Sequence, residues 1–112
     1  MAPLSEPSRE LARRILGDVE FENRLVAFRL HPRMGPAQVT LYSFGELADF
    51  FHDPFPQLEI GELEQWMRKV IGDVELAEKI RSLAGSREGE REKLERLRRL
   101  LETRLVQCLR IG

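Results

Sequence analysis

Residues 61–80 constrain the fold more than any other part of the chain, because they specify two helices and the turn between them. Apolar side chains recur there at helical spacing, at Leu63, Trp66, Met67, Val70 and Ile71. Gly72 and Asp73 follow directly. Glycine readily adopts the left-handed backbone that ends a helix, and an aspartate side chain caps the first N–H groups of the next one. The pattern therefore predicts helices over 62–71 and 74–84, joined by a sharp turn and packed on a common core.

The segments 4–16 and 44–52 show the same helical spacing. For the first helix, either Ser5 or Ser8 can provide the N-terminal cap. The second starts with a capping box, Ser43-Phe44-Gly45-Glu46. We expect the Ser43 hydroxyl to accept a hydrogen bond from the Glu46 N–H, and the Glu46 carboxylate to accept one from the Ser43 N–H.

Residues 21–30 favour a strand, and their nearly continuous apolar character suggests that it is covered on both faces. A loop with two prolines follows, and alternation around Val39 and Leu41 indicates a second strand that forms a hairpin with the first. Residues 58–60 could form a third, edge strand. The sequence therefore predicts an α+β fold: a small two- or three-stranded antiparallel sheet packed by about five helices, ending in an amphipathic C-terminal helix.

The 112 residues suit a single domain, with a compact part over 1–85 and a charged linker and helix over 86–112. The net charge of −1 gives no general attraction to nucleic acid or to an anionic membrane. No apolar run approaches the roughly 20 residues that span a bilayer. Cys108 is the only cysteine, which fits a reducing compartment. We therefore expect a cytoplasmic protein that does not contact membranes.

The C-terminal helix has two possible roles. Residues 86–93 carry no apolar side chain, and an apolar stripe follows at Leu94, Leu97, Leu101, Leu105, Cys108 and Leu109. The stripe could close the core of its own domain or pair with a second copy of the chain. Leu100 and Val106 lie outside it and favour pairing, because a helix held between its own core and a partner needs two apolar edges. We therefore predict a homodimer through Leu94, Leu97, Leu101, Leu105 and Leu109.

Nucleic acid is the alternative partner, through the Arg-rich region 81–110. The candidate contacts there are Arg87, Arg91, Arg98 and Arg99. Glutamates alternate with these arginines at helical spacing, which instead indicates a charged surface that pairs with itself. The helices 62–71 and 74–84 are no helix-turn-helix reader, because their turn is too short and the second helix begins with acidic residues. We therefore consider nucleic acid an unlikely partner.

The sequence offers no pattern typical of catalysis. His31 and His52 lie on different elements without the spacing of a metal site, and their role stays open. Cys108 lies on the apolar stripe, so we expect an inert buried thiol. Trp66, at helical spacing with Leu63 and Val70, is interpreted as a core residue. There is no glycine-rich phosphate loop. We predict no catalytic residue, no metal ligand and no cofactor, and expect the protein not to be an enzyme.

The segments Ser43-Phe44-Gly45-Glu46-Leu47 and 66–77 together resemble a prokaryotic family of small domains of unknown function. That family has an S-L-x-E-F helix start and a W-I-R-D-V-I-G-D-x-x-L-A segment. The resemblance covers roughly residues 20–83. The chain departs from the pattern at 58–62, where the family tends to have a Phe-His pair and an Arg-Gly-Asp. The resemblance implies an α+β domain and neither a reaction nor a cofactor. The expected function is a non-catalytic interaction or regulatory module, with an unknown protein partner.

Overall fold

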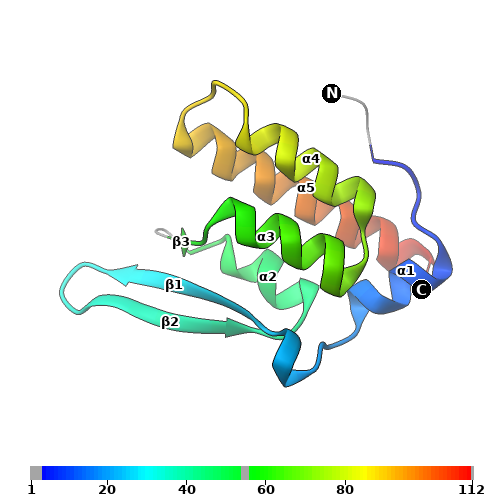
Figure 1. Cartoon of the computed structure of the whole chain (residues 1–112), viewed down its shortest axis with the longest axis horizontal. Helices are drawn as coiled ribbons and strands as arrows, with labels where there is room; N and C mark the ends of the chain where they lie inside the picture. The colour runs from blue at the N-terminus through cyan, green and yellow to red at the C-terminus, as the bar shows by residue number, and fades with distance from the viewer. Residues whose placement is uncertain (1–3, 54–55, 112) are drawn as a thin grey trace.

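Helices form one body of the molecule, and a sheet lies along its side (Figure 1). The computed structural model describes residues 4–53 and 56–111. Its elements are α1 (Arg9–Leu16), β1 (Leu25–His31), β2 (Gly35–Leu41), α2 (Phe44–Phe50), β3 (Pro56–Gln57), α3 (Ile60–Trp66), α4 (Val74–Ala84) and α5 (Glu90–Ile111), with a 3-10 turn at Phe21–Asn23 and a π turn at Met67–Ile71. The predicted α+β fold with an antiparallel sheet and a C-terminal helix is confirmed.

The sheet has the order β2-β1-β3, and both pairings are antiparallel. The predicted hairpin is confirmed, and its strands pair from Leu25 with Leu41 to His31 with Gly35. The first strand begins only at Leu25, because Phe21–Asn23 form the 3-10 turn. The third strand is Pro56–Gln57 rather than 58–60, because α3 already begins at Ile60.

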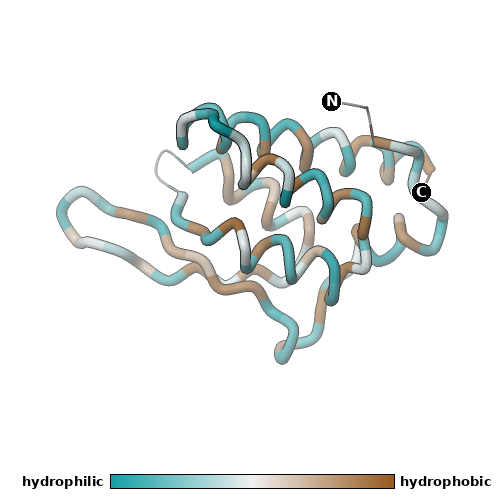
Figure 2. Tube along the Cα trace, turned by 45° about the horizontal axis from the view of Figure 1, so that its top comes forward, coloured by the Kyte–Doolittle hydropathy of each residue, from teal (hydrophilic) through white to brown (hydrophobic). Residues whose placement is uncertain are grey.

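The expectation that β1 is covered on both faces is wrong. Leu25 and Ala27 are buried at 5% and 1% exposure, whereas Phe28 and Leu30 are each 44% exposed. The hairpin extends beyond the helices, so they cover only the face near its base (Figures 1 and 2). Within residues 4–53 and 56–111, the helices therefore leave the apolar side of β1 partly exposed in the outer half of the hairpin.

The predicted helix pair and its turn are confirmed, with one addition. α3 continues directly into the π turn at Met67–Ile71. Gly72 then takes a left-handed backbone with φ of 84°, and both its N–H and that of Asp73 donate to the Met67 carbonyl. Asp73 Oδ1 accepts from the Leu76 N–H at 3.1 Å, which caps α4. The apolar spacing did not reveal the π turn, because it keeps the same side chains on the buried side.

The capping box of α2 is confirmed in one half and shifted in the other. Ser43 Oγ accepts from the Glu46 N–H at 3.1 Å, as expected. Glu46 Oε1, however, accepts from the Tyr42 N–H at 2.6 Å instead of that of Ser43. The backbone at Ser43 is extended, with φ of −153° and ψ of 161°, and successive N–H groups of an extended chain point to opposite sides. The carboxylate therefore meets the preceding residue.

The C-terminal helix forms part of the core. α5 contacts α1, α2 and α4 along its length. Leu97, Leu101 and Cys108 are at most 1% exposed and belong to the same apolar cluster as Phe44 and Trp66. At the other end of the chain, α1 begins only at Arg9, with Ser8 as its cap. α1 also packs against α5, so the first and last helices of the chain are neighbours in the helical body.

Trp66 anchors α3 to the base of the hairpin. It is 6% exposed, and its Nε1 donates to the Asn23 carbonyl at 2.6 Å. We expect Trp66→Ala to lower the free energy of unfolding by about 3–5 kcal/mol, because it leaves a cavity. Trp66→Phe keeps most of the volume and loses the hydrogen bond, so it should cost less. Urea denaturation measures both. A cost for the alanine variant of about 0.5 kcal/mol, the range of surface substitutions, would contradict this role.

Leu101 distinguishes a helix that closes the core from one that only pairs with a partner. It is fully buried, whereas Leu109 on the same helix is 62% exposed. A buried unpaired carboxylate is strongly destabilising, so Leu101→Glu should yield an unfolded chain. The matched Leu109→Glu should keep the wild-type circular dichroism spectrum and nearly its stability. A stably folded Leu101→Glu variant would show that α5 is not needed for the core.

Candidate functional site

The predicted interaction stripe needs correction, because the chain itself covers most of it. Leu97 and Leu101 are fully buried, Leu94 and Leu105 are half-buried, and only Leu109 is exposed. The stripe faces α1, α2 and α4, whose apolar sides need this cover. Leu97 and Leu101 are therefore not available to a partner. Self-association stays a prediction, and a contact through α5 would have to use the edge with Val106 and Leu109.

Arg104 lies in the Arg-rich region 81–110 but does not belong to a solvated charged surface. It is 1% exposed. Its Nε lies 2.8 Å from Asp73 Oδ2, and its Nη2 lies 3.0 Å from Glu75 Oε1. Its Nη1 donates to the Ser5 carbonyl at 2.7 Å and to Gln107 Oε1 at 2.9 Å. The signal was present in the sequence, since Arg104 has helical spacing with Leu101 and Cys108 on the buried side.

This buried charge cluster is structural. Asp73 is also 1% exposed and caps α4, so the Arg104–Asp73 pair holds α5 against the α3–α4 turn. Glu75 accepts from the Ser5 backbone N–H at 3.0 and 3.2 Å. That hydrogen bond, with a further contribution from Arg104, lowers the pKa of Glu75 against the opposing effect of its burial. The guanidinium has protein partners on all its nitrogens, so it offers nothing to a ligand.

The histidines and the cysteine do not form a common site. His31 Nδ1 accepts from the backbone N–H groups of Arg33 and Met34 in the hairpin turn, while His52 Nε2 lies 3.1 Å from Glu102 Oε1. Cys108 is fully buried, and burial raises the pKa of its thiol. Within residues 4–53 and 56–111, no group of three or more His, Cys, Asp and Glu side chains is placed to hold a metal ion.

The arginines proposed for nucleic acid are partly neutralised. Arg98 lies 2.6 Å from Glu95 and 3.9 Å from Glu102, and Arg99 lies 3.4 Å from Glu95. Arg87 and Arg91 form no ion pair with the described residues. Half of the predicted contact set is therefore paired within α5 itself, which agrees with the interpretation as a mixed charged surface.

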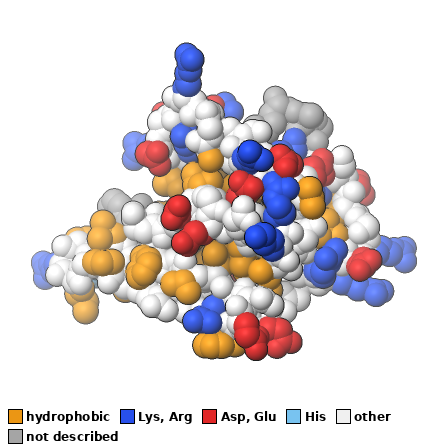
Figure 3. Space-filling view, in the orientation of Figure 1, with side chains coloured by type: hydrophobic (Ala, Val, Ile, Leu, Met, Phe, Trp, Pro, Cys, Tyr) orange, Lys and Arg blue, Asp and Glu red, His pale blue; other side chains and the backbone are white. Residues whose placement is uncertain are grey.

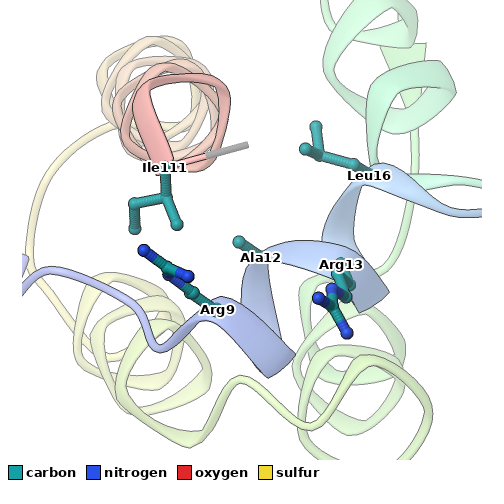
Figure 4. Close-up of a pocket in the computed structure, with 5 residues that line it drawn as sticks. All are labelled: Arg9, Ala12, Arg13, Leu16 and Ile111. Atoms are coloured by element: carbon teal, nitrogen blue, oxygen red, sulfur yellow. The ribbon is translucent and has the colours of Figure 1, made fainter.

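A hollow of about 300 Å³ lies between α1 and the end of α5 (Figure 4). Arg9, Ala12, Arg13, Leu16 and Ile111 line it. The two guanidinium groups come from successive turns of α1 and are exposed, so they could attract a small anion. No other polar side chain of the described residues lines this hollow to position a ligand. It is therefore a weaker candidate than the surface of the hairpin.

The outer face of the hairpin is an uncovered apolar surface. The register places Val26 opposite Thr40, Phe28 opposite Gln38 and Leu30 opposite Pro36, all on one side of the two strands. Phe28 and Leu30 are each 44% exposed, and Met34 in the turn is 83% exposed. Hydrophobic side chains lie along the projecting hairpin (Figure 3). Neighbouring exposed side chains of this size often mark a contact with another molecule.

The charged residues of the hairpin itself are all positive, whereas Glu20 and Glu22 flank Phe21 just before it. Residues 23–45 contain no Asp or Glu, but they contain Arg24, Arg29 and Arg33. Arg29 is neutralised by an ion pair with Asp53, in which Arg29 Nε lies 2.7 Å from Asp53 Oδ2. Arg24 stacks on the Phe21 ring at 4.0 Å, and Phe21 is itself 64% exposed. Neither Arg24 nor Arg33 forms an ion pair with a described residue. We define the hairpin surface as Phe21, Arg24, Phe28, Leu30, Arg33 and Met34.

Sequence reasoning predicted the hairpin but missed this surface. The signal was the alternation of Phe28 and Leu30 with Arg29 and His31, which indicates one apolar face. Because the strand is expected from its composition to be buried on both faces, the sequence does not indicate that Phe28 and Leu30 are exposed.

Comparison of the chain with protein-family models, curated proteins and solved structures finds no significant match. The resemblance to a prokaryotic family of unknown function therefore stays a prediction. Over the part of the chain that the structure describes, no helix is long and apolar enough to cross a membrane.

The Glu75 contacts predict a pH dependence of stability. The pKa of Glu75 is lowered in the folded state, so its carboxylate stabilises the fold above the ordinary pKa of about 4.3. This contribution is lost as the pH falls from that value towards the lower folded-state pKa. Glu75→Gln should therefore reduce stability at pH 7 and reduce the further loss between pH 5 and pH 3. Urea midpoints across this range test it, and an acid limb identical to wild type would contradict it.

Proposed function

We propose that the protein is a non-catalytic interaction module and that the hairpin surface is where it docks another protein. One observation carries the proposal: three large apolar side chains, Phe28, Leu30 and Met34, stand exposed on a hairpin that projects from the helical body. Full burial of an aromatic or aliphatic side chain contributes about 1.5–3 kcal/mol. A partner that covers these three would thus gain useful binding free energy from a small area.

The hairpin is held in place before any partner arrives. β3 pairs with Phe28 and Arg29 on the edge of β1 that faces away from β2. The Arg29–Asp53 ion pair connects the same strand to the segment that follows α2. His31 Nδ1 accepts two backbone N–H groups in the turn. A surface that is already ordered loses little conformational entropy on binding, which supports its use as a docking element.

The size of the surface favours a reversible contact. Apolar patches on monomers commonly reach about 300–600 Å², whereas a standard stable interface buries about 800 Å² on each partner. Three exposed apolar side chains correspond to a patch of this size, which is smaller than a standard stable interface. The proposal is therefore regulation or recruitment through a transient partner, in the cytoplasm. Self-association through Val106 and Leu109 belongs to the proposal only as a weaker addition, because these two side chains are flanked by charged ones.

Nucleic acid is retained as the alternative partner of the Arg-rich helix. The free guanidinium groups at Arg87 and Arg91 favour it, and the pairing of Arg98 and Arg99 with glutamates opposes it.

Site-specific photo-crosslinking in the native host tests the docking surface. A photoreactive residue at position 30 should yield a defined protein adduct, because Leu30 lies in the middle of the hairpin surface. The matched control is position 74, where Val74 is 53% exposed, comparable to the 44% of Leu30. Phe28→Ser in the same chain should reduce the adduct at position 30. Equal adducts at both positions, or none at position 30, would contradict the proposed site.

A further inference from the structure

The charges and dimensions of the hairpin surface also specify the kind of partner. We infer that it binds an amphipathic helix of another protein, with an apolar stripe and acidic residues near both of its ends. This inference rests on the proposed docking function and adds the chemistry of the partner to it.

The positive charges bracket the apolar side chains. Arg24 immediately precedes β1, and Arg33 lies in the turn at the far end of the hairpin. The seven residues of β1 span about 23 Å at roughly 3.3 Å per residue. A helix covers the same length with about 15 residues, at about 1.5 Å each. Acidic side chains near the two ends of such a helix would reach the two guanidinium groups.

The spacing of the apolar side chains also suits a helix. Phe28 and Leu30 point to the same side of β1, about 6.6–6.8 Å apart along the strand. Side chains four residues apart on a helix are separated by about 6 Å along its axis. Met34 continues the surface past the end of the strand and adapts to irregular shapes, because its side chain is unbranched. One row of leucines on a helix can therefore contact all three.

The lack of acidic residues within the hairpin favours a partner with negative charge. Residues 23–45 contain no Asp or Glu, so nothing within the hairpin neutralises Arg33 or attracts a basic segment there, whereas Glu20 and Glu22 lie beside Phe21 at the Arg24 end. A second copy of the chain is a poorer occupant, because its helices already bury their apolar sides in their own core. A nucleic acid strand would need more phosphate contacts than these two free cations provide.

The test uses the full chain and synthetic peptides of about 16 residues. The probe is a fluorescent amphipathic peptide with a leucine stripe and glutamates near both ends, and its control carries lysines in place of the glutamates. The acidic peptide should bind with a Kd on the order of 10 µM, and the lysine peptide at least about tenfold more weakly. Phe28→Ser should weaken binding of the acidic peptide about tenfold, while Val74→Ser should leave its binding unchanged.

Charge reversal isolates the electrostatic part of the inference. Arg33→Glu should weaken the acidic peptide and strengthen the lysine peptide, each by about three- to tenfold at low salt. Circular dichroism of these variants tests whether they are folded, which is expected because Phe28, Arg33 and Val74 are exposed.

Several outcomes would overturn the inference. The first is equal binding of both peptides, and the second is no binding of either. A third is tighter, salt-sensitive binding of a single-stranded oligonucleotide that Phe28→Ser abolishes. A fourth is a dimer in sedimentation that Phe28→Ser dissociates. If a protein adduct still forms at position 30 while the acidic peptide fails, the docking function stands and only the chemistry of the partner is wrong.

Discussion

The buried ion pair between Arg104 and Asp73 is the contact on which the arrangement of the helices depends. It joins α5 to the turn between α3 and α4, and its remaining nitrogens reach Ser5 and Gln107. Such a pair adds little net stability, since both charges lose their hydration. Its geometry, however, is satisfied only when the turn, α5 and the N-terminal segment all occupy these positions. A different packing that still buried Arg104 or Asp73 would leave a charge without its partner.

The helical body and the hairpin therefore have different tasks. The body encloses Trp66, Leu101 and their neighbours, and in it the charged and apolar groups satisfy one another. The hairpin takes its rigidity from this body through Trp66, whose indole N–H binds Asn23 just before β1. It leaves Phe28 and Leu30 uncovered. A surface of this kind persists because neighbouring elements hold the strands in place without covering their outer face.

The charges show where reasoning from local spacing succeeds and where it fails. Arg98 and Arg99 pair with Glu95 three and four residues away, and this spacing is visible in the sequence. Arg104 pairs with Asp73, 31 positions earlier in the chain. Both kinds of arginine look alike in a helix rich in charge. Only the position of Arg104 between Leu101 and Cys108 on the helix distinguishes it, and that clue gains its meaning once the partner is known.

The sequence by itself determined the elements: the helix pair around Gly72 and Asp73, the hairpin, the cap at Ser43 and the apolar stripe of α5. These follow from backbone preferences and from periodicity, which act over a few residues. The tertiary structure decided what covers each apolar face. It buried Leu97 and Leu101 in their own domain and left Phe28, Leu30 and Met34 to solvent. Periodicity shows that a face is apolar, but only the packing of distant segments decides whether the chain or another molecule buries it.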